Sequence, residues 1–150
     1  MKIKTLVAVL LLSGGVTSTF AQSDCNANSS ISHEAVRAKN FKDAYAPCMA
    51  VLKDCPTLRY YTYTDAQKIL TGLMSQIKDR NSAEYKKLFD ELMAVHDQKM
   101  KYIPEFASKM KGVPSVASAL GTKAVDYLQY APAPDLNQAY AWLKELSRNR

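Results

Sequence analysis

The segment N-F-K-D-A-Y-A-P-C-M-A-V-L-K-D-C-P, residues 40–56, says most about the architecture of this chain. Its small and apolar residues recur at helical spacing and end at a proline, the positions being Ala44, Cys48, Val51, Leu52 and Pro56. A short side chain such as that of Ala44 allows a second helix to approach closely. We therefore predict a helix over residues 41–53 that packs against a neighbouring helix.

This spacing resembles the second helix of a tetratricopeptide repeat, a unit of two antiparallel helices, over about a quarter of the chain. The resemblance implies an all-α fold. That fold would be a right-handed solenoid, or α-α superhelix, of about three helical hairpins that follow a signal peptide. Hairpins of this kind stack on one another and present a groove to a protein or peptide partner.

The first two hairpins are predicted from their caps and apolar stripes. The first covers residues 30–54, with Ser29 or Ser30 as the N-cap of its first helix. The second opens at a capping box, T-D-A-Q at residues 64–67, in which the threonine and the glutamine satisfy backbone groups of the first turn. Its second helix is expected to stop near Tyr102, ahead of a proline that removes a backbone hydrogen bond.

The third hairpin is predicted to start at Ser115, to turn after Tyr130 and to begin its last helix at Asp135. The apolar stripe of the last helix should be presented to a further repeat or to another copy of the chain, through Leu136, Tyr140 and Leu143. Solenoids need polar capping helices at their ends. We therefore expect either self-association through the C-terminal hairpin or a repeat array of which residues 22–150 are the N-terminal part.

The N-terminus has the order of features of a secretory signal peptide. Lys2 and Lys4 precede an apolar run at residues 5–12, and Thr19 and Ala21 place small residues before a cut after Ala21. The apolar run is shorter than the roughly 20 residues that span a membrane. We predict a signal peptide over residues 1–21 and a periplasmic or secreted protein with no transmembrane segment in the mature chain.

Charge and composition restrict the class of partner. The formal net charge of +6 falls to +4 once the two lysines of the signal peptide are removed. The remaining basic residues are scattered and form no continuous stripe, so we predict no nucleic-acid partner.

The histidines and Cys48 are the candidate catalytic residues of the sequence. His33 and His96 lie on different predicted hairpins, and neither has a second ligand at metal-binding spacing. The sequence contains no G-x-S-x-G motif and no glycine-rich phosphate loop. The helical phase of Cys48 places it in the core, where a free cysteine packs as a small apolar residue. We therefore predict a protein that is not an enzyme and that holds no metal or cofactor.

Three cysteines are an odd set for an exported protein. Cys48 and Cys55 are about 10.5 Å apart along one helix, beyond the reach of a disulfide. An antiparallel hairpin brings Cys25, before the first helix, close to Cys55, at the end of the second. We predict a Cys25–Cys55 disulfide, with three reduced thiols or an interchain bond as the alternatives.

The lead hypothesis is an interaction scaffold or adapter of the bacterial cell envelope. In the repeat proteins that the chain resembles, the first helix of each hairpin lines the groove. The resemblance thus assigns four residues of the first hairpin to partner binding: Ser29, His33, Val36 and Arg37. Helical phase opposite the apolar face of the next hairpin adds three more: Lys68, Thr71 and Ser75.

Two other functions stay open from the sequence. One is a subunit of an envelope enzyme whose active site needs residues of a partner chain. The other is a carrier of a small apolar ligand, with three neighbouring tyrosines at its mouth: Tyr60, Tyr61 and Tyr63. A deep apolar pocket would favour either of these, whereas an open groove would favour the scaffold.

Overall fold

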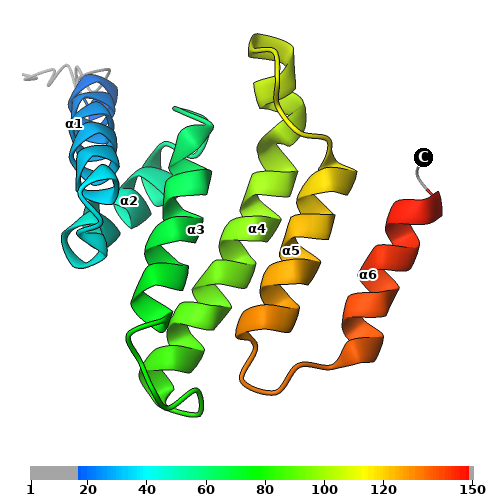
Figure 1. Cartoon of the computed structure of the whole chain (residues 1–150). Helices are drawn as coiled ribbons and strands as arrows, with labels where there is room; N and C mark the ends of the chain where they lie inside the picture. The colour runs from blue at the N-terminus through cyan, green and yellow to red at the C-terminus, as the bar shows by residue number, and fades with distance from the viewer. Residues whose placement is uncertain (1–16, 149–150) are drawn as a thin grey trace, which may run out of the picture.

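The computed structural model describes the backbone of residues 17–148 and the side chains of residues 24–148. This part of the chain consists of helices joined by short connections, without a strand, as predicted (Figure 1). The helices are α1 (Thr17–Arg37), α2 (Phe41–Asp54), α3 (Tyr61–Met74), α4 (Ala83–Lys109), α5 (Val116–Tyr130) and α6 (Leu136–Arg148).

The helices follow one another up and down, so that each packs against the next in the chain, and α1 also packs against α3 (Figure 1). Helices α1 to α4 share most of one apolar core. Its fully buried side chains include Ile69 and Leu70 of α3 and Leu92 of α4. Burial of this apolar surface is the main stabilising contribution to the fold.

At several helix starts a polar side chain accepts a hydrogen bond from a free backbone N–H. Asn40 caps α2, Ser82 caps α4 and Ser115 caps α5 in this way. Helix α2 contains Pro47, yet its apolar residues occupy the core at the predicted phase. The helix predicted over residues 41–53 is therefore confirmed.

Two predicted helix starts are wrong. Helix α3 begins at Tyr61, one turn before the predicted capping box, and the Thr64 hydroxyl donates to the Tyr61 carbonyl at 2.8 Å. Helix α1 begins at Thr17, so Ser29 and Ser30 lie within the helix and cap nothing. Burial of α3's first turn explains the earlier start, because Thr62 and Tyr63 are in the core.

Helix α4 also runs further than predicted. It passes through Pro104 and ends at Lys109 rather than near Tyr102. Proline removes one hydrogen bond from a helix, but burial on both sides can offset this loss. Ile103 and Phe106 are both buried, and they hold the last turns of α4 against the rest of the molecule.

The predicted cleavage point after Ala21 lies within α1, while residues 1–16 of the predicted signal peptide are outside the described part of the chain. In the described part of the chain, no helix combines the length and apolar character needed to cross a membrane.

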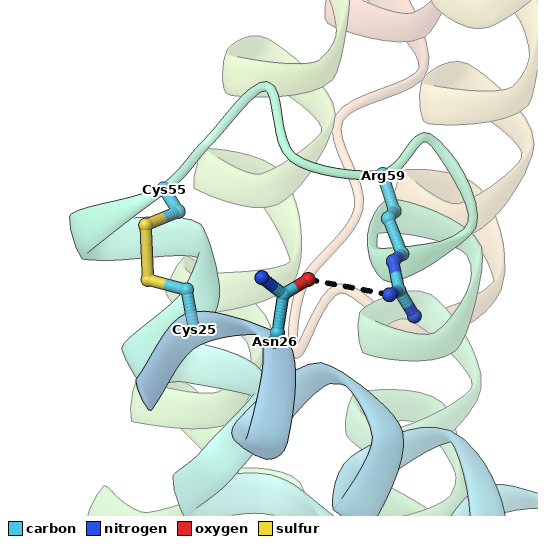
Figure 2. Close-up of a disulfide and its surroundings, with 4 residues drawn as sticks. All are labelled: Cys25, Asn26, Cys55 and Arg59. Atoms are coloured by element: carbon cyan, nitrogen blue, oxygen red, sulfur yellow. Dashed lines mark hydrogen bonds between the residues drawn. A yellow bond between two sulfur atoms is a disulfide. The ribbon is translucent and has the colours of Figure 1, made fainter. Parts of the chain in front are cut away.

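The predicted disulfide between Cys25 and Cys55 is present, with the two Cα atoms 6.3 Å apart (Figure 2). It joins α1 to the end of α2, as the antiparallel hairpin requires. Cys48 is buried and is the free cysteine of the described residues.

Helix α6 is attached by one face. Ala139 is buried, and the Trp142 ring packs edge-on against Tyr127 of α5 with centroids 5.2 Å apart. The adjoining apolar stripe is exposed as predicted, at Leu136, Tyr140 and Leu143.

Candidate partner-binding surface

Two side-chain hydrogen bonds join α1 to α3. The Ser29 and Tyr61 hydroxyls are 3.2 Å apart, and Nδ1 of His33 is 2.7 Å from Oδ2 of Asp65. Both pairs are separated by 32 residues in the sequence. The two helices therefore run parallel and in register, because the second contact lies four residues, or about one helical turn, after the first on both helices.

Tyr61 is the centre of a group that we call the Tyr61 cluster: Asn26, His33, Arg59 and Tyr61. Arg59 donates a hydrogen bond to the Tyr61 hydroxyl. It donates a second, of 3.3 Å, to Oδ1 of Asn26, which Figure 2 shows as a dashed line. The guanidinium lies 5.7 Å from the centre of the Tyr61 ring, and the His33 ring lies 4.5 Å from it. Asn26 follows Cys25 directly, so the disulfide fixes the part of α1 that carries it.

The His33–Asp65 pair is half open to solvent. The His33 side chain is 37% exposed, whereas that of Asp65 is 3% exposed. Because a carboxylate accepts hydrogen bonds, Nδ1 of His33 carries a hydrogen and donates a hydrogen bond to Asp65. Asp65 thus fixes the orientation of an imidazole that a partner can reach, and no hydroxyl or thiol of the described residues is hydrogen-bonded to its Nε2.

Cys48 lies behind this pair, in the core. Burial raises the pKa of its thiol to about 12, and the charge of Asp65 adds to the effect. The thiol lies 3.6 Å from the Thr62 carbonyl, which can accept its weak hydrogen bond. Because the thiolate is the nucleophile, a thiol in this environment is chemically inert.

The structure corrects part of the predicted partner-binding set. Ser29 and Val36 are buried between helices and cannot contact a partner, because α3 covers that side of α1. The other five side chains are exposed or half-exposed: His33, Arg37, Lys68, Thr71 and Ser75.

The accessible residues differ in what they offer. The hydroxyls of Thr71 and Ser75 donate to backbone carbonyls of their own helix turn, at 2.8 Å and 2.6 Å. Arg37 lies 3.2 Å from Glu34, an exposed pair that contributes little. Lys68 has no ion pair with any described residue. By the register of α1 and α3, Arg37 lies level with Ile69, the residue after Lys68, and both cations are exposed.

The three neighbouring tyrosines do not form one patch. Tyr60 and Tyr63 pack edge-on against Phe106 of α4, with ring centroids 5.5 Å and 6.0 Å apart. Tyr63 has no exposed surface. Only Tyr61 faces the α1–α3 contact, so the proposed carrier mouth of three tyrosines is not assembled.

A second histidine pair lies where α3, α4 and α5 meet. Nε2 of His96 and the amide of Gln67 both donate to Oδ2 of Asp126, each at 2.7 Å. His96 is buried, and its Nδ1 has no hydrogen-bond partner among the described protein atoms. Nearby, burial lowers the pKa of Lys99, and the charge of Asp126 partly opposes this shift.

This second cluster was missed by the sequence reasoning, which identified no partner for His96. Its helical phase did contain a signal, because His96 follows the buried Leu92 by four residues and shares its face. Its acceptor could not be predicted, since Asp126 is 30 residues away in the sequence.

Among the described residues, no group of three or more His, Cys, Asp and Glu side chains could hold a metal ion. The chain matched no known protein family, no curated protein and no solved structure at a significant level. Its surface must therefore be interpreted from its own residues.

Proposed function

We propose that the protein is a helical-repeat scaffold of the bacterial cell envelope that binds a protein or peptide on the surface formed by α1 and α3. The observation that carries the proposal is the parallel register of alternate helices. Contacts at a constant separation join α1 to α3, at 32 residues, and α2 to α4, at 46 residues.

Such a register means that the second hairpin repeats the orientation of the first instead of inverting it. Repetition of this kind is the basis of solenoids, in which each hairpin packs on its neighbours and odd helices line one surface. It supports assignment to a tetratricopeptide-like, right-handed superhelix. On this assignment α1 and α3 contribute side by side to the partner-binding surface.

The Tyr61 cluster supplies the chemistry of recognition. Tyrosine and arginine are enriched among the residues that dominate binding energy at protein interfaces. Tyr61 and Arg59 are held in place by hydrogen bonds before any partner arrives, which reduces the entropy lost on binding. Arg37 on α1 and Lys68 on α3 add exposed positive charge to these two helices.

The disulfide supports the envelope as the site of action. Cys25 and Cys55 would remain reduced in a bacterial cytosol, whereas the periplasm and the exterior favour their oxidation. The predicted signal peptide is consistent with the same destination.

Affinity capture from an envelope extract of the source organism tests the function. The mature chain is compared with an Arg37→Glu, Lys68→Glu variant, and with a Lys86→Glu, Lys111→Glu control that makes the same charge change at other exposed positions. We expect the first variant to lose a protein that the wild type and the control both retain. Recovery of a small molecule instead, or equal capture by all three chains, would contradict the proposal.

A further inference from the structure

A second surface lies on the other pair of parallel helices, α2 and α4. Two hydrogen bonds cross between them. The Tyr45 hydroxyl donates to Glu91 at 2.7 Å, and the Gln98 amide donates to the Leu52 carbonyl at 2.7 Å. Leu52 follows Tyr45 by seven residues on α2, and Gln98 follows Glu91 by seven residues on α4. Seven residues correspond to about 10.5 Å of helix. The surface therefore repeats after two turns.

Two hollows lie along this surface, and Tyr45 lines both of them. The larger has a volume of about 470 Å³ and an apolar floor of Leu73, Ile77 and Leu88. The smaller has a volume of about 250 Å³ and an apolar floor of Met49, Leu52 and Val95. Leu88 and Val95 are seven residues apart on α4, so the hollows follow the same two-turn spacing.

The charges around the hollows differ between the two helices, and the α4 side includes Glu84, which lines the larger hollow and has no ion pair among the described residues. Glu91 is engaged within the protein by Tyr45 and by Lys87, whose Nζ is 3.8 Å away. Lys42 lines the larger hollow and Lys53 the smaller, and neither has an ion pair among the described residues. The α2 side therefore carries two uncompensated cations, eleven residues or about 16 Å apart along the helix.

We propose that this surface docks an amphipathic helix of a partner protein. Two apolar side chains of that helix, seven residues apart, enter the two hollows. Acidic residues on one flank meet Lys42 and Lys53. Helices that bind in grooves use anchors at this spacing, and complementary charge sets their orientation and their rate of association. This site is separate from the α1–α3 surface and does not depend on it.

A synthetic helix provides the probe. It carries two leucines seven residues apart and two glutamates eleven residues apart on one flank, and a matched control peptide carries lysines in place of the glutamates. Peptide binding is followed by NMR through the methyl signals of Met49 and Leu88. We expect the acidic peptide to bind at least about tenfold more tightly than the basic one, with weaker binding at high salt.

Variants of the protein complete the test. Lys42→Glu combined with Lys53→Glu should reverse the preference between the two peptides, whereas Lys86→Glu with Lys111→Glu should leave it unchanged. All four positions are exposed, and circular dichroism verifies that each variant is folded. Equal binding of both peptides, or no binding, would overturn the proposal. Decanoate is tested in the same way. If decanoate shifts these methyl signals and the acidic peptide does not, the hollows bind a small amphiphile and the proposal is overturned.

Discussion

Gly72 lies where α3 meets the start of α2. A Cβ atom at this position would overlap the ring of Phe41, which is packed against the core. Gly72→Ala should therefore lower the free energy of unfolding by about 1–3 kcal/mol, even though alanine is the better helix former. Denaturant unfolding measures the change.

Gly121 provides the matched control in another helix interior. Its added Cβ would meet Leu146 at 3.5 Å, an ordinary contact distance. Gly121→Ala should raise the free energy of unfolding by roughly 0.5–1 kcal/mol, because alanine restricts the unfolded chain. Equal effects of the two substitutions would show that the close approach of α2 and α3 is absent.

Cys48 should resist modification while the protein is folded. Burial, with the charge of Asp65 as a second cause, raises the pKa of its thiol to about 12, so the reactive thiolate is scarce at pH 8. We expect negligible alkylation by iodoacetamide in native buffer and complete alkylation in denaturant, as measured by mass spectrometry. Rapid labelling of the native protein would place Cys48 outside the core.

Sequence reasoning works at the residue scale where the cause is local. Ser82 and Ser115 cap their helices through backbone groups three residues away, and such caps are readable from sequence. The pairs His33–Asp65 and His96–Asp126 join residues 32 and 30 positions apart. Their partners depend on how the helices stack, which no local pattern specifies.

At the scale of elements, α6 should be the least stable helix of the described chain. It buries Ala139 alone, and its contacts run mainly to α5, where Lys123 binds Asp97 and lies 4.6 Å from the Trp142 ring. Hydrogen exchange measures the consequence, because helices with few buried contacts open locally. We expect the amides of α6 to exchange well before those of α3. Equal protection of the two helices would contradict this view.

Helix boundaries were predicted well where a cap or an apolar stripe ends abruptly, as for α2 and α5. They were missed where tertiary packing extends a helix beyond its local signal. The turn of α3 before Thr64 and the turns of α4 after Pro104 both exist because Tyr60, Tyr63 and Phe106 pack together. Sequence patterns show that such residues are apolar, but they do not show which elements will meet.

For the whole molecule, alkaline pH should be destabilising. Burial raises the pKa of Tyr45 to about 12, with the hydrogen bond to Glu91 as the second cause, and burial also raises the pKa values of Tyr60, Tyr63 and Tyr85. Tyrosines of the unfolded chain ionise near pH 10. The contribution of these tyrosines to the free energy of unfolding is therefore fully present below about pH 10. It is lost as pH rises through their pKa values in the folded protein.

Urea unfolding at pH 8 and pH 11 tests this dependence. Burial lowers the pKa of Lys99, so this residue alone would make the protein more stable as pH rises. Its single contribution is set against those of the four tyrosines. We expect a lower unfolding midpoint at pH 11, and a smaller difference between the two pH values for Tyr63→Phe. A midpoint that does not fall at pH 11 would contradict the burial of these phenols.

The claim that α1 and α3 form the partner-binding surface is tested most directly by site-specific photocrosslinking in the envelope of the source organism. A photoreactive residue replaces Lys68 on that surface in one chain, and Lys86 on α4 in another. We predict a discrete protein adduct at position 68, removed by Arg37→Glu, and none at position 86. Adducts of equal yield at both positions, or none at position 68, would contradict the account.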